Sequence, residues 1–372
     1  MKGYYLFAPD EPGAAGPTSG VERKVRSQCN ALNQYLTCTL VKLDPPVYRR
    51  DPVEMLVRRL PYTAAWRKWK YKGEFDDADF LYIRQVYHDQ SFLRYLKSIR
   101  KNNPDIQIIY EVPTYPFEKG GKLTISNYPF AMKRRKSIRA IFEQMDRVIT
   151  FYGQKTILGV PCIDLINGYD FSRVELPRRE RTDVIHIISV AMTATWHGYD
   201  RFLAGLSDYY KNGGRENIVY HYVGYVMPEH ERYVQENQLE GHVIFHGMQS
   251  GEPLKTLMQQ CFLGIDVLGG HRKDYPVSSS LKSREYCAYG IPIITSSPID
   301  FLPKDSPYQF LAPYDDSPVD MEGVVRFYHS VYDGKDCNKV AADIRAYAEA
   351  CCDMKITMKP VADWLKKNEF KP

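Results

Sequence analysis

Residues 278–292 read SSSLKSREYCAYGIP and combine the pattern of a helix with residues suited to an anion. Serines before an apolar residue are typical of a helix start, Gly290 is typical of its end, and Pro292 opens the next strand. Lys282 and Glu285 are three residues apart, so they share a helix face. A cation beside a helix N-terminus suits a diphosphate, and a carboxylate one turn later suits ribose hydroxyls. A surface ion pair fits the spacing equally well.

Around this segment, short apolar strands alternate with amphipathic helices, which is the pattern of parallel α/β sheets. The first half predicts strands at residues 4–8, 38–43, 80–84, 106–112, 147–151 and 162–166. The second half predicts strands at residues 184–191, 218–224, 243–247, 263–268 and 291–296. Helices are expected near residues 21–36, 199–210, 253–261 and 280–289, and from residues 319, 339 and 359 onward.

The polar, proline-containing stretch 172–183 between the two halves is typical of a linker. The sequence therefore predicts two doubly wound, Rossmann-like domains, residues 1–171 and 184–355, followed by a C-terminal helix in residues 356–372. In such sheets a ligand binds beyond the carboxyl ends of the strands.

The composition is that of a folded, globular protein. The 372 residues are 44% hydrophobic and 26% charged, which is enough to build two cores and excludes a disordered chain. No apolar run approaches the ~18–20 residues of a membrane-spanning helix, and Asp10 and Glu11 follow the first apolar run too soon for a secretory signal. Eight cysteines without a C-x-x-C spacing argue against a zinc site or a disulfide framework, so a cytoplasmic protein is expected.

The net charge of +5 is unevenly distributed. Residues 49–72 hold eight basic and two acidic residues, with tryptophan and tyrosine among them, and a second basic cluster spans residues 133–139. Three interpretations remain open for the segment 58–72: a solvated loop, a nucleic-acid surface, or an anionic membrane surface. The chain shows no recognised nucleic-acid module, so nucleic acid is the weakest of the three.

Metal chemistry is not predicted. Asp77 and Asp79 precede a predicted strand, whereas a metal-binding Asp-x-Asp pair is expected at the carboxyl end of one. No other acid or histidine cluster has the spacing of metal ligands, and no catalytic base is evident.

Further motifs recur at the ends of the predicted strands, in the order Gly16–Val21, Asn167–Asp170, His197–Asp200, Tyr222–Gly224, Val243–Gly247, and Leu268–Lys273 followed by Ser280–Lys282. Together with residues 278–292, their order and spacing resemble the family 4 glycosyltransferases of the GT-B fold over most of the chain. The segment from Leu268 to Lys282 is similar to a subset that assembles bacterial capsular and surface polysaccharides.

This resemblance implies two Rossmann-like domains facing each other across a cleft, with the C-terminal helix crossing back to the first. It implies a retaining, metal-independent enzyme that moves a sugar from a nucleotide-diphosphate sugar to a lipid-linked glycan at the inner face of the cytoplasmic membrane. The leaving diphosphate would itself deprotonate the acceptor hydroxyl. No cofactor and no nucleic acid are expected. The membrane interpretation of the basic-aromatic segment follows, with a patch of Arg58, Arg59, Trp66, Arg67, Lys68, Trp69 and Lys70.

Site residues carry over by position in the motifs. Lys282 is expected at the diphosphate, Glu285 at the ribose, and His197 as a hydrogen-bond donor in the phosphate region. The rest of the donor side is expected to comprise Gly20, Gly224, Gly247, His271, Arg272, Ser280 and Leu281. The acceptor side is not carried over from a motif: it is expected at the ends of the predicted strands 80–84 and 106–112, with Arg84, Glu111, Thr114 and Tyr115. For Glu111, a structural carboxylate fits as well.

Three positions depart from the family. Val277 stands where the first of two glutamates usually holds the transferred sugar, and His197 stands where a lysine is usual. The histidine that many relatives place after a central strand of the first domain has no counterpart, since residues 111–116 read EVPTYP. Two other functions remain: a nucleotide-sugar epimerase of the same architecture, and a glycan- or lipid-binding protein without catalysis.

Overall fold

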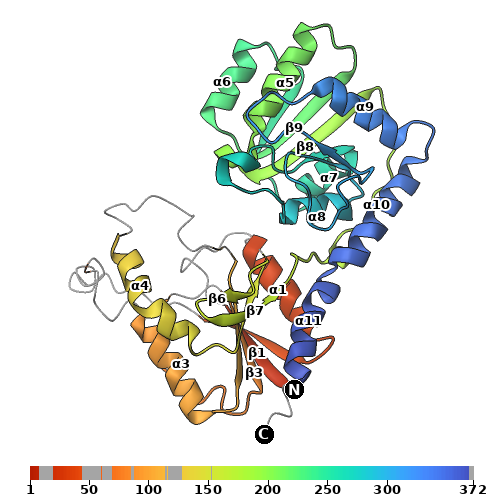
Figure 1. The fold of residues 1–372 in the computed structure, drawn as a ribbon. Helices are drawn as coiled ribbons and strands as arrows, with labels where there is room; N and C mark the ends of the chain where they lie inside the picture. The colour runs from red at the N-terminus through yellow and green to blue at the C-terminus, as the bar shows by residue number, and fades with distance from the viewer. Residues whose placement is uncertain are drawn as a thin grey trace. The chain divides into compact units, whose positions relative to one another are not determined.

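The computed structural model of the protein describes residues 1–7, 20–43, 60, 69–84, 88–113, 115, 128–151 and 153–367. These residues form two compact units (Figure 1). Unit 1 comprises residues 1–165 and 357–372, and unit 2 comprises residues 166–356. Within the described ranges, no helix has both the length and the apolar character needed to cross a bilayer.

The described residues of unit 1 form seven strands: β1 (Lys2–Phe7), β2 (Thr37–Lys42), β3 (Phe80–Arg84), β4 (Gln107–Glu111), β5 (Arg147–Thr150), β6 (Thr156–Ile157) and β7 (Val160–Asp164). Their order in the sheet is β2-β1-β3-β4-β5-β7-β6, and all neighbours are parallel except β6 and β7. Every residue of β3 is buried, as expected for a central strand covered on both faces.

The described helices of unit 1 are α1 (Gly20–Leu32), α3 (Gln90–Asn102), α4 (Tyr128–Phe142) and the greater part of α11 (Met354–Lys367). Asp89 caps α3 by accepting the N–H of Phe92 at 2.9 Å, and the helix buries Phe92, Leu96 and Ile99. In α11 the buried residues include Val361 and Leu365. The Leu365 carbonyl accepts a hydrogen bond from Gln107 of β4, so this helix covers the sheet of unit 1.

Unit 2 is built on six parallel strands: β8 (Val184–Met192), β9 (Asn217–Tyr225), β10 (Val243–Gly247), β11 (Leu263–Ile265), β12 (Ile293–Thr295) and β13 (Gln309–Leu311). Its α-helices are α5 (Tyr199–Lys211), α6 (Pro228–Glu236), α7 (Glu252–Gln260), α8 (Leu281–Ala288), α9 (Met321–Tyr332) and α10 (Cys337–Cys352). Three short 3₁₀ helices complete it: η1 (Phe171–Arg173), η2 (Thr195–His197) and η3 (Gly270–Lys273).

The strand order of unit 2 is β10-β9-β8-β11-β12-β13, so the direction of winding reverses between β8 and β11. Open parallel sheets bind their ligands at such a switch point, beyond the carboxyl ends of the two strands. The predicted fold class of two doubly wound α/β domains is confirmed. Residues 172–183, expected as a linker, lie within unit 2, where Val174 is buried and Arg179 donates to the carbonyls of Met258, Cys261 and Tyr289.

Candidate functional site

The candidate site lies at the switch point of unit 2, where β8 and β11 are neighbouring strands. The turn after β8 passes through η2, and the N–H of Leu268, beyond β11, donates to the His197 carbonyl at 2.8 Å. Gly198 follows with a φ of +68°, and a Cβ there would clash with the backbone of Leu268 and Gly269. The close approach of the two segments therefore explains the glycine in the His-Gly turn.

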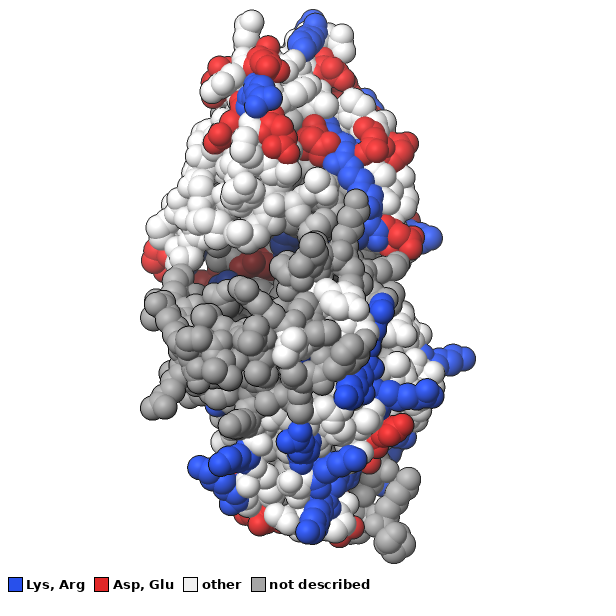
Figure 2. Space-filling model, turned by 90° about the vertical axis from the view of Figure 1, so that its left-hand side faces the viewer, with Lys and Arg blue, Asp and Glu red and all other residues white. Residues whose placement is uncertain are grey.

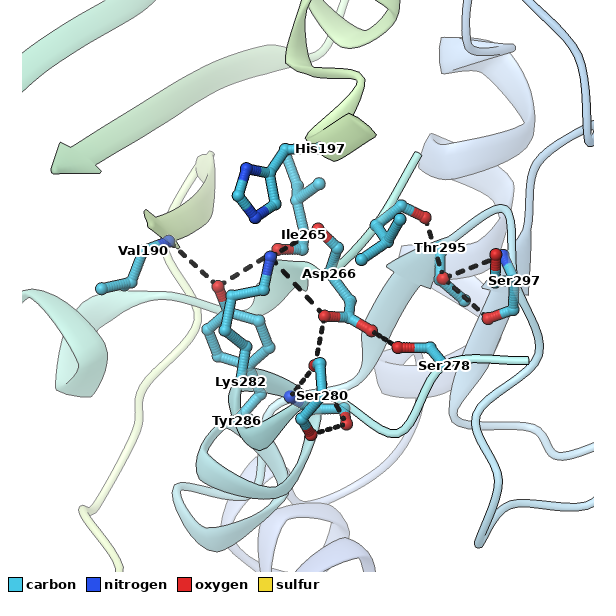
Figure 3. A network of polar contacts seen from close by, with 12 residues as sticks. Val190, His197, Ile265, Asp266, Ser278, Ser280, Lys282, Tyr286, Thr295 and Ser297 are labelled. Carbon is cyan, nitrogen blue, oxygen red and sulfur yellow. Dashed lines mark hydrogen bonds and ion pairs between the residues drawn. The ribbon is translucent and has the colours of Figure 1, made fainter. Parts of the chain in front are cut away.

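Asp266 directly follows β11, and its carboxylate is fully buried. It accepts hydrogen bonds from the hydroxyls of Ser278 at 2.6 Å and Ser280 at 2.5 Å (Figure 3). Ser280 is also the N-cap of α8, because its side chain accepts the N–H of Ser283 at 3.2 Å. A buried carboxylate thus fixes the first turn of the helix that begins at the site.

Lys282, in the first turn of α8, points back toward the end of β11 (Figure 3). Its ammonium lies 3.7 Å from a carboxylate oxygen of Asp266 and donates to the Asp266 carbonyl at 3.0 Å. Burial lowers the pKa of Lys282, and the negative charge of Asp266 opposes this shift. The side chain is 17% exposed, so the cation is largely desolvated but still reachable.

His197 and Lys282 both lie near the aromatic ring of Tyr199. The imidazole stacks on that ring at 5.4 Å between centroids, and the Lys282 ammonium lies 5.7 Å from the same ring. Burial, with Lys282 and Lys273 nearby, lowers the pKa of His197 to about 3, so the imidazole is neutral at pH 7. Because Nδ1 accepts the N–H of Ala194 at 3.0 Å, the proton is on Nε2. His197 therefore offers one N–H donor beside the Lys282 cation.

Glu285 lies one turn after Lys282 and is half-buried. The hydroxyl of Tyr169 donates to Glu285 at 3.5 Å. Asn167 donates to the Ser279 carbonyl at 2.7 Å, and its own carbonyl accepts from Arg284 at 2.9 Å. The Asn167–Asp170 segment therefore contacts α8 on both sides of Lys282 and helps to hold the turn that carries Lys282 and Glu285.

Two other predicted donor-side residues lie in η3, and both bind carboxylates from other parts of unit 2. Arg272 forms a bidentate pair with Asp200 at 2.7 and 2.8 Å and also contacts Asp316 and the Thr195 carbonyl. His271 contacts Asp316 at 2.9 Å. These pairs tie η3 to the start of α5, which gives Arg272 a structural task that its position in the sequence does not reveal.

The three predicted donor-side glycines lie in three different elements. Gly224 in β9 has a φ of +118°, and a Cβ there would clash with the Ala191 carbonyl, so close strand packing explains this residue. Gly247 ends β10 at the same edge of the sheet, Gly20 is the first residue of α1 in unit 1, and Leu281 begins α8.

The predicted acceptor-side residues Arg84 and Glu111 end adjacent strands of unit 1 and form an ion pair. Glu111 is fully buried and accepts hydrogen bonds from Tyr82 at 2.5 Å and Gln28 at 2.8 Å. Lys24 of α1 lies 3.5 Å from its other oxygen. Glu111 is therefore the centre of a polar cluster at the carboxyl edge of this sheet.

Tyr115 is half-buried, and Thr114 lies outside the described residues. Of the expected membrane patch, Arg58, Arg59, Trp66, Arg67 and Lys68 also lie outside them. Lys70 is exposed, whereas the indole of Trp69 packs near Phe92 and Tyr95 of α3. Trp69 is half-buried and contributes to packing.

Sequence reasoning missed Asp266 and Tyr199. The available signal was an acidic residue inside the otherwise apolar run 263–268, a place where charge is costly without a partner. Within the part of the chain that the structure describes, no group of three or more His, Cys, Asp or Glu side chains is arranged to hold a metal ion.

Comparison with solved structures identifies the fold. HepE from Anabaena, solved with UDP and glucose, has a TM-score of 0.60 at 12% identity, and the match covers 99% of this chain and 100% of HepE. Sucrose-phosphate synthase from Thermosynechococcus elongatus has a TM-score of 0.62 at 13% identity, with 99% of both chains covered. A glycosyltransferase from Rickettsia africae has a TM-score of 0.65 at 10% identity, covering 100% of this chain and 99% of the other.

No protein-family model matches the chain, and no curated protein sequence matches it. At these identities the structural likeness establishes the architecture alone: the chain has the two-domain GT-B fold of these glycosyltransferases.

Proposed function

We propose that this protein is a retaining, metal-independent glycosyltransferase that moves a sugar from a nucleotide-diphosphate sugar to a lipid-linked glycan in surface polysaccharide assembly. The observation that carries the proposal is Lys282, held by Asp266 in the first turn of α8 at the switch point of unit 2. The fold shared with HepE, which was solved with UDP and glucose, supports the same substrate class.

In this proposal the diphosphate lies between the Lys282 ammonium, the Nε2–H of neutral His197 and the N-terminus of α8. A largely desolvated cation acts strongly on a phosphate because little water screens it, and the helix dipole adds to the attraction. Glu285, one turn further along α8, accepts the ribose hydroxyls.

The proposed chemistry takes place on one face of the sugar. The bond between the anomeric carbon and the diphosphate oxygen breaks, and the acceptor oxygen bonds to the same face of that carbon. The acceptor proton passes to a diphosphate oxygen. Lys282 stabilises the charge that develops on the leaving diphosphate. No carboxylate base is needed, which fits Asp266 being engaged by Ser278, Ser280 and Lys282.

The acceptor belongs, in this proposal, at the carboxyl edge of the sheet of unit 1, where Arg84 and Glu111 lie. Arg84 supports the assignment because its Nε is buried without a hydrogen-bond partner among the described residues. A lipid-linked acceptor implies that the protein works at the inner face of the cytoplasmic membrane.

Turnover of candidate donors tests the proposal. Purified protein is incubated with UDP-, GDP-, ADP- and CMP-sugars, with EDTA, and with or without a bacterial lipid extract as acceptor. We expect one donor to release its nucleotide when the extract is present, and a labelled lipid product whose anomeric configuration matches that of the donor. Lys282→Ala should lower kcat/KM at least tenfold, since it removes a charge-assisted contact worth about 1.5–3 kcal/mol.

The other outcomes distinguish the alternatives. An epimerase would change the donor sugar without any acceptor, and a binding protein would bind a partner without releasing nucleotide. An inverted product, or activity that EDTA abolishes, would contradict the mechanism while leaving the donor site in place.

A further inference from the structure

The carboxyl edge of the sheet of unit 1 has a switch point of its own. The strand order β2-β1-β3-β4 reverses the direction of winding between β1 and β3, whose last residues, Phe7 and Arg84, are register partners. The helix α1 begins at this edge, because it connects β1 to the parallel strand β2. Open parallel sheets bind ligands at such a point, and the N-terminus of a helix favours an anion there.

Two buried cations meet at this switch point. Arg84 ends β3 and forms an ion pair with Oε1 of Glu111, at the end of β4. Lys24, in the second turn of α1, lies 3.5 Å from the same oxygen. Side chains from three different elements therefore converge, and two positive charges share one carboxylate oxygen.

Glu111 is fully engaged by the protein. Its Oε2 accepts hydrogen bonds from the Tyr82 hydroxyl at 2.5 Å and from the Gln28 amide at 2.8 Å, while Oε1 faces the two cations. The Glu111 side chain is 0% exposed, whereas the side chains of Arg84 and Lys24 remain 6% and 7% exposed. The carboxylate thus lies behind the cations, and the cations are the groups that an entering ligand meets.

Arg84 keeps one donor that the described protein groups do not use. Its Nε is buried without a hydrogen-bond partner among the described residues. A buried donor without a partner destabilises the fold, and the planar guanidinium matches the two oxygens of a carboxylate or phosphoryl group. An oxyanion bound here accepts the Nε–H and balances positive charge that the shared Glu111 carboxylate offsets only in part.

Burial distinguishes these two cations from the general basicity of unit 1. Figure 2 shows many lysine and arginine side chains on the surface of unit 1, where water solvates them. An exposed cation binds a single anion weakly, because water and salt screen its charge. A buried cation acts on an anion through little water, and Lys282 beside Asp266 is the corresponding pair at the switch point of unit 2.

We propose that Arg84 and Lys24 bind an oxyanion of the acceptor, a phosphoryl or carboxylate group, and that Glu111 positions the two cations. The acceptor is therefore a glycan that carries negative charge. The inference rests on the proposed function in one respect, because it takes the ligand to be the acceptor of the transfer. Binding of the anion itself requires neither a donor nor turnover.

Saturation-transfer NMR with the full chain tests the proposal. The probes are glucose 1-phosphate, which carries a phosphoryl group, glucuronate, which carries a carboxylate, and neutral glucose. The site variants are Arg84→Gln and the conservative Arg84→Lys. The matched control, Arg94→Gln, makes the same change at an exposed position of α3, and Lys282→Ala removes the cation of the donor site.

We expect the wild type to bind an anionic probe and not glucose, and the anion that binds more tightly identifies the charged group of the acceptor. Arg84→Gln should weaken that binding at least tenfold, because a charge-assisted contact is lost. Arg84→Lys should recover part of it, since it keeps the charge without the planar fork. Arg94→Gln and Lys282→Ala should stay within about threefold of the wild type.

Equal binding of glucose, no binding of either anion, or binding that depends on Lys282 and not on Arg84 would overturn the proposal. Circular dichroism checks that each variant folds. If Arg84→Gln does not fold, Lys24→Gln takes its place, because it leaves the ion pair of Arg84 and Glu111 intact. Lys24→Gln should weaken anion binding at least threefold, and unchanged binding would overturn the proposal as well.

The outcomes separate this inference from the proposed function, because Arg84 and Lys24 belong to unit 1 and Lys282 belongs to unit 2. If an anionic probe binds through Arg84 and no sugar nucleotide binds, the oxyanion site stands and the proposed transfer function fails. If a sugar nucleotide binds through Lys282 and neither anionic probe binds, the proposed function stands and the oxyanion site fails.

Discussion

At the scale of single residues, Asp266 organises the candidate site. Its fully buried carboxylate receives two serine hydroxyls and faces the Lys282 ammonium, so one side chain sets both the start of α8 and the position of the cation. A buried charge is costly alone and stabilising only while its partners remain. The pair therefore links the stability of unit 2 to the geometry of the donor site.

We predict that Asp266→Asn lowers the free energy of unfolding of unit 2 by about 3 kcal/mol, because it leaves the Lys282 cation without its counter-charge. Donor affinity should fall as well, since Lys282 loses its support. Native-state hydrogen exchange of strand amides in unit 2 measures the first effect.

Asp363→Asn is the matched control, because Asp363 pairs with Lys359 on the exposed surface of α11. Removing an exposed pair should cost less than about 1 kcal/mol. If the two variants changed stability equally, the Asp266 carboxylate would have no special role.

At the scale of elements, three histidines form a hydrogen-bonded row across neighbouring strands. His186 of β8 lies 2.9 Å from His221 of β9, and His221 lies 2.9 Å from His246 of β10. A neutral imidazole has one N–H donor and one acceptor nitrogen, so neutral rings can hydrogen-bond to one another along the row. Burial lowers the pKa of all three, that of His221 to about 4.

This row predicts that unit 2 loses stability in acid. The unfolded chain takes up a proton on His221 near pH 6.5, whereas the folded chain does so near pH 4. Stability from this group is therefore full above pH 6.5 and is lost as the pH falls toward 4, by about 2 kcal/mol at pH 5. Hydrogen exchange of the β9 amides at several pH values measures the slope, and His221→Gln should flatten it.

His329→Gln provides a control of opposite sign. Asp333 and Glu216 raise the pKa of His329, so this residue stabilises the fold in acid and loses that effect as the pH rises. His329→Gln should therefore make the free energy of unfolding fall more steeply as the pH is lowered. A flatter slope in both variants would show that the row is not the cause.

The elements also show what the sequence can predict. β10 occupies the residues that the apolar pattern indicated, and α8 begins after the serine cap and ends before Gly290, since both signals are local. The partners of Asp266 and Arg272 were not predictable, because Ser278 is 12 residues from Asp266 and Asp200 is 72 residues from Arg272. Those contacts depend on how strands and helices pack, which residue spacing does not encode.

At the scale of the whole molecule, the two units share one architecture but differ in character. Each is a doubly wound sheet with polar side chains at the carboxyl ends of central strands. Unit 2 places a largely desolvated cation at its switch point, and unit 1 carries the basic helices α3 and α4. In the proposed function, unit 2 binds the donor and unit 1 meets the acceptor.

The central claim is that unit 2 binds a nucleoside diphosphate through Lys282. Calorimetric titration of UDP, GDP, ADP and CDP into the wild type, Lys282→Ala and Lys211→Ala tests it most directly. Lys211 is the control because it ends α5, and the C-terminus of a helix lies at the opposite edge of such a sheet.

We predict that one nucleotide binds the wild type, that Lys282→Ala weakens its binding about 10- to 100-fold, and that Lys211→Ala changes it less than threefold. Binding that Lys282→Ala leaves unchanged, or the absence of binding by every nucleoside diphosphate, would contradict the account.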